Sequence, residues 1–463
     1  MTFGIHILGD LILFLSKLCI DIFLKLVHSP QVLYPCEIGK LNNTNALSDV
    51  GSGTSSPKEF KETELDFASS ENVIKNELTS RVITANDIVD IVHAHGYLVH
   101  EHVVKTKDGY LLSIHHIQGK ETVSDSTSSV DKPVVYLHHG LLTNSELFVL
   151  GDTTSRCLPF RLIEEGYDVW LGNNRGNKYS QRHLKYTTKD DRFWNFSLDE
   201  FALFDIPDTI NYILNVTGQT SLTYIGFSQG SSQAFAALSV NPDLNDKINL
   251  FIGLSPAMIP KGLNNETCGR LINTAPSMLY SLFGKRAIMP SVVFWQRILG
   301  PHLYERVVDA SLSFLFNWNI ENISTLQKII GYPHMFSPTS VKSVVHWFQI
   351  IANRRFQMYD EGGCSGSKFV YLSGATERAN RVAPFPTRNI KTPMLLIYGQ
   401  SDMLIDMDKL CAQITSPLEV IGIPTYEHMD TLWARDVESA VFDKIIKRLK
   451  GYPKVYNKNN ISI

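Results

Sequence analysis

The sequence predicts an α/β fold, in which helices cover both faces of a mostly parallel central sheet and a cap is inserted. The first observation is that short apolar runs alternate with helical patterns over 84–256 and again over 391–450. Such alternation is typical of parallel sheets, because each crossover between parallel strands usually contains a helix. The second is that 257–390 lacks the alternation and is rich in aromatic residues, Met and helical patterns, which predicts the cap.

The predicted strands are short apolar runs with the residue types that strands prefer. The strong ones are 133–139, 167–172, 221–226, 248–256 and 392–399, and a weaker one is 418–423. Before them, a short amphipathic helix is expected near residue 88, followed by a hairpin whose strands, 100–106 and 110–117, flank Asp108-Gly109. Ser197 and Glu200 have the spacing of a capping box and open a predicted helix over 196–214.

Composition excludes several classes of function. The chain has 463 residues, 44% of them apolar, and a formal net charge of −3, with no long basic tract of the kind that nucleic-acid binding needs. The six cysteines are scattered without a CxxC pair, so we expect neither a disulfide framework nor a zinc site, although Cys268 and Cys364 could pair in an oxidising compartment. No metal or organic cofactor is implied.

The two ends of the chain differ from its centre. Residues 1–29 are mostly apolar, but His6, Asp10, Lys17, Asp21, Lys25 and His28 fall within about 100° of a helical wheel. A wide apolar face beside a narrow polar stripe predicts a membrane-interfacial or membrane-embedded helix, with packing on the protein's own core as the alternative. Residues 40–83 are polar and predict a flexible linker, and 451–463 form a C-terminal tail.

Gly226-Phe227-Ser228-Gln229-Gly230 is the candidate nucleophile site. The G-x-S-x-G pattern is common by chance, but here it follows a predicted strand and precedes a predicted helix. In that context the serine sits on a sharp turn at the carboxyl edge of the sheet, and the two glycines avoid clashes. The alternative is an ordinary Gly/Ser turn. The fold class that this context predicts is the α/β-hydrolase fold, with Ser228 as nucleophile.

The acid and the base should follow the nucleophile in that order. Asp402 comes just after the predicted strand 392–399, and Asp406 competes with it four residues later. His428 is the only histidine after Asp402, which makes it the candidate base. The candidate oxyanion donors are the backbone amides of Leu141, in the loop after an early strand, and Gln229. His138 and His139 precede that loop and could orient it without any role in proton transfer.

Seven segments together resemble the acid lipase family, which includes lysosomal acid lipase, gastric lipase and the fungal steryl ester hydrolases. They are DGYLLSIHHI (108–117), LHHGLL (137–142), WLGNNRGNKYS (170–180), FWNFSLDEFALFDIP (193–207), GFSQG (226–230), YGQSDMLID (398–406) and YEHMDTLWA (426–434). The resemblance covers about 84–445. It implies the same triad, the same two oxyanion donors, a cap over the site, and hydrolysis of long-chain acyl esters of sterols or glycerol.

The chain departs from the family pattern in two ways. The secreted members begin with a cleaved signal peptide, whereas residues 1–29 are more similar to the membrane-embedded fungal steryl ester hydrolases. Phe227 stands where several relatives carry His beside the nucleophile.

The resulting hypothesis is a membrane-anchored serine lipase for neutral lipid esters, that is, steryl esters or triacylglycerols. It would act at a lipid droplet or the endoplasmic reticulum membrane, which residues 1–29 would bind. The alternatives are a phospholipid or lysophospholipid esterase or a thioesterase with the same triad, a catalytically dead membrane-tethered scaffold, and a secreted, glycosylated lipase.

Overall fold

A computed structural model describes part of the chain, namely 77–120, 132–262, 269–270, 272–290, 292, 296, 299–319, 321–361 and 382–451. The predicted interfacial helix 1–29 lies outside the described residues, as do 40–76 of the predicted linker and 452–463 of the tail. The linker does not extend to residue 83, because Glu77–Ile83 form the helix α3, which buries Thr79 and Val82.

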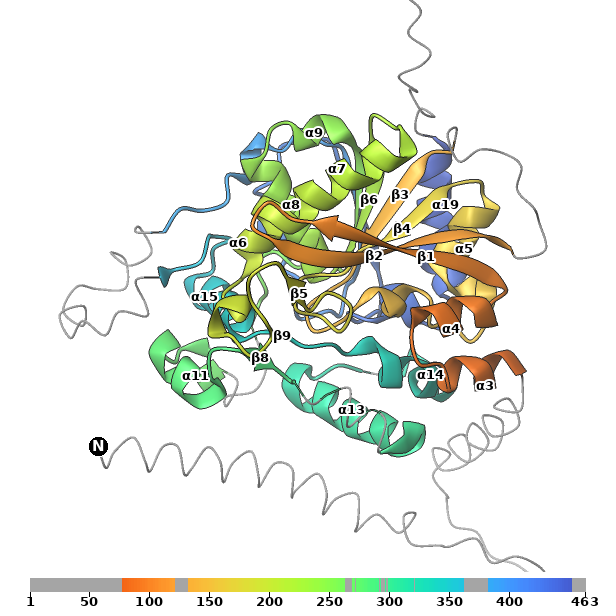
Figure 1. The fold of residues 1–463 in the computed structure, drawn as a ribbon, viewed down its shortest axis with the longest axis horizontal. Helices are drawn as coiled ribbons and strands as arrows, with labels where there is room; N and C mark the ends of the chain where they lie inside the picture. Colours follow the sequence, from red (N-terminus) through yellow and green to blue (C-terminus); the bar gives the residue numbers. More distant parts are fainter. Residues whose placement is uncertain are drawn as a thin grey trace, which may run out of the picture. The chain divides into compact units, whose positions relative to one another are not determined.

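A nine-stranded mixed sheet forms the centre of the described fold (Figure 1), with the strand order β1-β2-β4-β3-β6-β7-β10-β11 and β5 paired to β2. The strands β4, β3, β6, β7, β10 and β11 are all parallel, and β2 pairs antiparallel with β1 and β4. Their bounds are β1 Tyr97–Lys105, β2 Tyr110–Lys120, β3 Val134–His138, β4 Asp168–Leu171, β5 Arg182–His183, β6 Leu222–Phe227, β7 Ile248–Leu254, β10 Met394–Gly399 and β11 Leu418–Ile423.

The helices lie before, between and after these strands. Their bounds are α4 Ile88–Ala94, α5 Leu158–Glu164, α6 Leu198–Glu200, α7 Ile206–Thr217, α8 Gln229–Val240, α9 Leu244–Lys247, α11 Pro276–Phe283, α13 Gly300–Phe316, α14 Thr325–Met335, α15 Val341–Asn353, α17 Met407–Cys411, α18 Asp430–Trp433 and α19 Asp443–Lys450. The short strands β8 (Ala287–Ile288) and β9 (Thr339–Ser340) pair with each other away from the main sheet.

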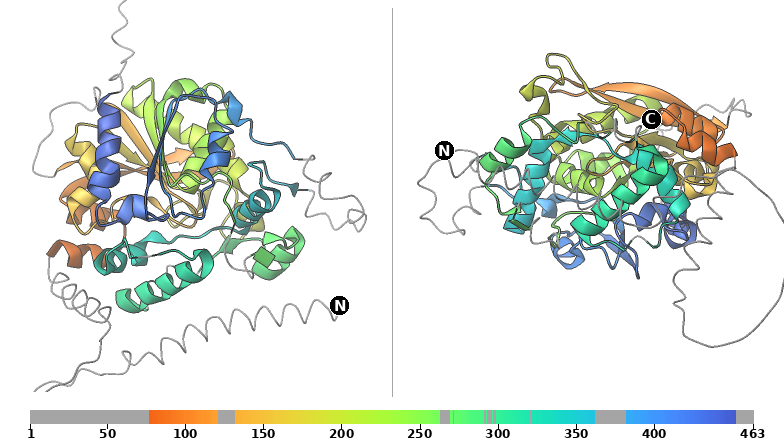
Figure 2. Two further views of the ribbon diagram at one scale, coloured as in Figure 1. Left: turned by 180° about the vertical axis from the view of Figure 1, so that it is seen from behind. Right: turned by 90° about the horizontal axis from the view of Figure 1, so that it is seen from below.

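Side chains alternate between the two faces of the sheet and build a separate core on each. Along β3, Val135 and Leu137 join one buried cluster, while Val134 and Tyr136 join the other. The helices α7, α8 and α9 contribute to the core on the second face, and α7 and α8 lie in front of the strands in Figure 1. The helices α5 and α19 cover the first face, which Figure 2 (left) shows from behind. The period of two along each strand therefore places helices on both faces, as the sequence predicts.

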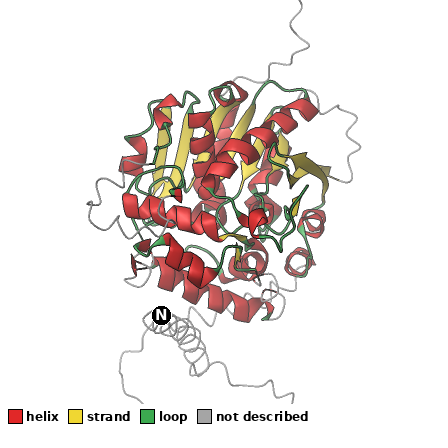
Figure 3. Cartoon of the chain, turned by 60° about the vertical axis from the view of Figure 1, so that its left-hand side comes forward, coloured by secondary structure: helices red, strands yellow, loops and turns green. Residues whose placement is uncertain are grey.

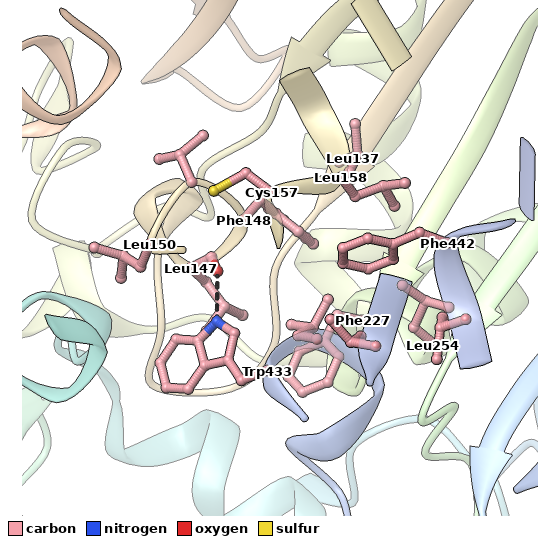
Figure 4. Close-up of a cluster of buried hydrophobic side chains, with 14 of the residues drawn as sticks. Leu137, Leu147, Phe148, Leu150, Cys157, Leu158, Phe227, Leu254, Trp433 and Phe442 are labelled. Atoms are coloured by element: carbon pink, nitrogen blue, oxygen red, sulfur yellow. Dashed lines mark hydrogen bonds between the residues drawn. The ribbon is translucent and has the colours of Figure 1, made fainter. Parts of the chain in front are cut away.

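The core on the first face also supports the loops that carry the candidate site. Figure 4 shows Phe227 and Leu254, from the ends of β6 and β7, in the same cluster as Phe442. The indole nitrogen of Trp433 donates to the carbonyl of Leu147 at 3.2 Å. Apolar packing thus ties the carboxyl ends of the central strands to the C-terminal segment of the chain.

Residues between β7 and β10 contribute helices but no described strand of the main sheet. The helices α11, α13, α14 and α15 lie there and are seen below the sheet in Figure 1. Figure 3 shows the same arrangement of helices around the yellow sheet from another side. Hydrogen bonds connect this segment to residues near the C-terminus of the described chain. The side-chain amide of Asn322 donates to the carbonyl of Thr425 (2.8 Å) and to Asp430 Oδ2 (2.7 Å), and the amide of Arg435 donates to the carbonyl of Asn322 (3.0 Å).

The predicted fold class is confirmed, with strand bounds close to those expected, and the predicted helix 196–214 differs in one detail. Ser197 and Glu200 form the expected capping box, but a π-helical turn at Phe201–Asp205 interrupts the helix before α7. Pro207 has no amide hydrogen to bond the carbonyl of Leu203, so the regular ladder breaks there. Among the described residues, no helix is both long and apolar enough to cross a bilayer.

Candidate active site

Ser228 lies on the sharp turn between β6 and α8. Its backbone has φ 53° and ψ −118°, a conformation that L-residues rarely adopt. A Cβ on Gly226 would come within 2.6 Å of the amide nitrogen of Ser231, and one on Gly230 within 2.3 Å of the carbonyl oxygen of His138. Only glycine fits at both positions, because the atoms in the way belong to the backbone. The turn thereby presents Ser228 at the carboxyl edge of the sheet and the N-terminus of a helix.

The structure brings Ser228, His428 and Asp402 together in one hydrogen-bonded chain. His428 Nε2 lies 2.7 Å from Ser228 Oγ, and His428 Nδ1 lies 2.6 Å from Asp402 Oδ2. Asp402 and His428 are only 1% and 4% exposed, so water scarcely competes for these bonds. A carboxylate that accepts from Nδ1–H leaves Nε2 as the nitrogen that can receive the serine proton. The order carboxylate, imidazole, hydroxyl suits nucleophilic attack by the serine.

Asp406, the competing acid, lies elsewhere. Asp406 caps the N-terminus of α17, where its Oδ1 accepts from the amide of Lys409 at 3.2 Å and its Oδ2 lies 3.1 Å from the ammonium of Lys409. The Oδ1 of Asp402 accepts from the amide of Leu404 at 2.8 Å, which fixes that carboxylate while its other oxygen meets His428. The two acids are close in sequence, but only Asp402 contacts the histidine.

Apolar rings hold the imidazole of His428 in place. Trp318, just after α13, stacks on it with ring centres 5.4 Å apart, and Phe227 packs at 5.3 Å. The backbone of His428 is held as well, because its carbonyl accepts from Ser255 Oγ at 2.6 Å. Residues from three distant parts of the chain therefore restrict this ring, and Trp318 brings the segment between β7 and β10 against it.

The loop after β3 lies directly beside Ser228. A Cβ on Gly140 would lie 3.0 Å from Ser228 Cβ, so the next amide, that of Leu141, belongs to the immediate surroundings of the serine. Gln229 is the first residue of α8, and its amide has no carbonyl one turn earlier in that helix to bond. Both predicted donor residues thus flank Ser228. Backbone amides in such positions can stabilise an oxyanion.

His138 and His139 hold this loop through hydrogen bonds on both ring nitrogens. His138 lies 2.6 Å from the hydroxyl of Tyr136 and 2.8 Å from Asn174 Oδ1. His139 Nδ1 lies 2.8 Å from the carbonyl oxygen of Gly140, and its Nε2 accepts from the amide of Asn174 at 3.0 Å. Burial lowers the pKa of His138 to about 4 and that of His139 well below its usual value. Both rings are therefore neutral at neutral pH and serve as the loop's supports.

Glu427 is a buried carboxyl beside the histidine. It is 8% exposed; its Oε1 accepts weakly from the amide of Asn319 at 3.4 Å, and its Oε2 is buried without a hydrogen-bond partner among the described residues. Burial, and then the charges of Asp402 and Asp430, raise the pKa of Glu427 to about 7. A proton on Glu427 removes one of three neighbouring negative charges at low dielectric.

Replacing Glu427 with glutamine is expected to remove a pH-dependent contribution to stability. The folded-state pKa of about 7 lies above the ordinary value of 4.5, so the unfolded chain loses this proton first as pH rises. The stabilisation is fully present below pH 4.5 and is lost as pH rises towards about 7. Glutamine stays neutral in both states, so the Tm of Glu427→Gln minus that of the wild type should rise over this range, as measured by calorimetry.

Glu321→Gln is the matched control, since Glu321 is an exposed carboxylate in the segment after α13. Its Tm is measured over the same range, and the difference for Glu427→Gln is compared with it. A flat difference for Glu427→Gln would contradict the assigned pKa.

A further residue at the site is Trp347 of α15, whose indole nitrogen donates to Gln229 Oε1 at 2.6 Å. Sequence reasoning missed Glu427, Trp318 and Trp347, whose contacts cross long sequence separations. Glu427 is the neighbour of His428 and could have been noticed there, whereas the tryptophans had only the aromatic richness of 257–390 as a signal. Among the described residues, no group of three or more His, Cys, Asp or Glu side chains could hold a metal ion. Cys157 and Cys411 are free thiols, and the other four cysteines lie outside the described residues.

Comparison with known families agrees with this geometry. The family model described as the alpha/beta hydrolase fold matches residues 133–434, and a second model, the partial alpha/beta-hydrolase lipase region, matches 88–152. The first match covers more than half of the chain and includes the elbow, both acids and the histidine.

Curated relatives match over most of the chain. A protein named a probable lipase in Schizosaccharomyces pombe is 50% identical over 375 residues, which cover 81% of this chain and 82% of that protein. The human lysosomal acid lipase/cholesteryl ester hydrolase is 33% identical over 381 residues, which cover 80% and 92% of the two chains. A crystal structure from Sulfolobus solfataricus aligns with a TM-score of 0.51 at 13% identity, covering 77% of this chain and 95% of that one, and this likeness shows the fold alone.

Proposed function

Because this chain belongs to the lipases of the α/β-hydrolase fold family, with lysosomal acid lipase among its relatives, it is a carboxylic ester hydrolase that acts on lipid esters, and we propose that it is a serine lipase for neutral lipids. Its substrates in this proposal are steryl esters and triacylglycerols. The observation that carries the proposal is the hydrogen-bonded chain from Ser228 Oγ through His428 to Asp402 at the elbow.

The proposed reaction has two halves. In the first, Ser228 Oγ attacks the ester carbonyl carbon while His428 Nε2 takes the hydroxyl proton. The amides of Leu141 and Gln229 stabilise the oxyanion of the tetrahedral intermediate. His428 then protonates the departing alcohol, which leaves an acyl group on Ser228. In the second half, His428 activates a water that releases the fatty acid, and Asp402 stabilises the imidazolium in both halves.

The preference for neutral lipid esters rests on two supports. One is the relative whose name includes cholesteryl ester hydrolase, at 33% identity over most of both chains. The other is the apolar surroundings of the base, where Trp318 and Phe227 pack on the imidazole. Apolar surroundings suit a sterol or acyl chain better than a charged headgroup, which would lose hydration there without a partner.

Membrane association is a further part of the proposal and rests on sequence alone. Residues 1–29 have a wide apolar face and a narrow polar stripe, which suits a helix in a lipid interface. An insoluble ester resides in a lipid phase, so tethering to a lipid droplet or the endoplasmic reticulum membrane raises the local concentration of enzyme at its substrate.

Substrate preference can be tested with the purified full chain. We expect release of fatty acid from emulsified cholesteryl oleate and trioleoylglycerol to be at least about tenfold faster than release from phosphatidylcholine. This is the difference expected if apolar surroundings desolvate a charged headgroup at a cost of about 1.4 kcal/mol or more. The variant Ser228→Ala serves as the inactive control. Phosphatidylcholine as the fastest substrate would replace this proposal with a phospholipid esterase.

A second pair of measurements distinguishes the proposed role of residues 1–29 in membrane binding from a role in catalysis. Ile12→Lys with Phe23→Lys places two charges on the apolar face of the predicted helix. This variant should lose activity on emulsions and keep its activity on a soluble ester, p-nitrophenyl butyrate. Equal loss on both substrates would contradict interfacial anchoring.

A further inference from the structure

We infer that the segment 334–347, which runs from the end of α14 into α15, holds both arms of the oxyanion hole in place. The first arm is Gln229, for which Trp347 is a positioning residue, and the second is the loop that contains Leu141. The inference deepens the proposed function and rests on it, since it concerns the same amides. Part of the region inserted between β7 and β10 would therefore position groups that act in catalysis.

The first arm is held through the side chain of Gln229. The indole nitrogen of Trp347 donates to Gln229 Oε1 at 2.6 Å, and the two residues are 7% and 2% exposed. A buried indole N–H without an acceptor is costly, so this bond fixes the rotamer of Gln229. Because Gln229 opens α8 directly after Ser228, fixing its side chain also restricts the orientation of its amide.

The second arm is held at the loop that contains Leu141. The amide of Ser337 donates to the carbonyl of Leu142 at 2.8 Å. The side-chain amide of Asn144 donates to the carbonyls of His334 (3.0 Å) and Met335 (3.2 Å) at the end of α14, where carbonyls have no partner within the helix. The loop and the end of α14 therefore satisfy each other's polar groups. Leu142 has φ 59°, a conformation that external bonds of this kind can maintain.

The segment 334–347 is itself fixed to the core. Ser340 Oγ donates to the carbonyl of Phe196 at 2.5 Å, and Ser337 Oγ accepts from the amide of Lys178 at 2.7 Å. Trp347 belongs to the buried cluster that also contains residues of α7 and α8. Both arms are thus held by the same segment, 334–347, which is itself bonded to the core. Oxyanion donors act by being preorganised, so the support sets their spacing before substrate arrives.

The test compares Trp347→Phe, Gln229→Met and the double variant in the full chain, with p-nitrophenyl butyrate as substrate. Each single change removes one partner of the bond and leaves every backbone amide present. We expect kcat to fall about 10- to 100-fold, less than the loss of a whole donor, with KM within about twofold. The double variant should be no slower than the slower single variant, because both changes remove the same interaction.

A trifluoromethyl ketone, which forms a tetrahedral adduct with a serine hydroxyl, provides the readout that a merely structural role would not move. Its inhibition constant should rise by the same factor as kcat/KM falls. Trp194→Phe is the matched control, because its indole also donates to a carbonyl, that of Thr188 at 2.8 Å, in a buried position. This control should keep kcat and the inhibition constant within about twofold.

The possible outcomes distinguish failure of this inference from failure of the proposed function. An active wild type with Trp347→Phe and Gln229→Met within twofold of it, or with losses that simply multiply in the double variant, overturns the inference alone. A fall in kcat without a change in the inhibition constant does so as well. A wild type as inert as Ser228→Ala overturns the proposed function and this inference with it.

Discussion

Replacing Ser228 with alanine is expected to lower kcat for ester hydrolysis by a factor of about 10⁶, the scale on which removal of a nucleophile acts in other serine hydrolases. The change removes the oxygen that forms the acyl-enzyme, while the neighbouring backbone amides remain. KM should therefore change little. Steady-state rates with p-nitrophenyl butyrate measure the loss, and a fluorophosphonate probe should label the wild type and leave the variant unlabelled.

Ser231→Ala is the control that separates nucleophilicity from packing. Ser231 lies three residues further along α8, is fully buried, and donates to the carbonyl of Gly226 at 2.7 Å. Its loss should lower the Tm and leave kcat within about threefold, since the bond contributes only about 1 kcal/mol to stability. A loss for Ser231→Ala comparable with that for Ser228→Ala would mean that disruption of the elbow, and not removal of the nucleophile, explains both.

Replacing Asp402 with asparagine is expected to lower kcat by a factor of about 10⁴. The asparagine amide would donate where the carboxylate accepts, so His428 would turn its lone pair towards position 402 and could no longer take the proton of Ser228. The imidazolium would also lose its counter-charge. The fall should appear in kcat at neutral pH with little change in Tm, because the two side chains have nearly the same shape.

Asp406→Asn tests the alternative acid in the same assay. Asp406 caps α17 and pairs with Lys409. Asparagine can still cap the helix but lacks the negative charge, so the change should reduce stability by about 0.3–1 kcal/mol and leave kcat within about twofold. If Asp406→Asn were the slower of the two variants, the acid would have to be reassigned.

The positions of the strands could be predicted from sequence because each is a short apolar run bounded by turn residues. The run 221–226 corresponds to β6 at Leu222–Phe227, and the weak run 418–423 coincides with β11. Local patterns failed where they were overruled by packing. Residues 77–83 are polar enough to suggest a linker, yet α3 forms because Thr79 and Val82 become buried against the rest of the fold.

The candidate site was predictable to the extent that it follows from chain order. Ser228, Asp402 and His428 could be placed because the fold fixes the sequence in which nucleophile, acid and base occur. The support from Trp347 could not, since its partner Gln229 is 118 residues away and nothing local distinguishes this tryptophan from the other aromatic residues between β7 and β10. Such contacts depend on how that segment docks, which is a property of the whole fold.

The pairing of β7 with β10 has a consequence for how the protein is made. These two parallel strands are neighbours in the sheet although the whole inserted region separates them in the chain. During synthesis, β7 therefore exists as an apolar strand with an open hydrogen-bonding edge until β10 has left the ribosome. A nascent chain that stops within the inserted region displays that edge and lacks both Asp402 and His428. A chain truncated there should therefore be inactive and should aggregate more readily than the full chain.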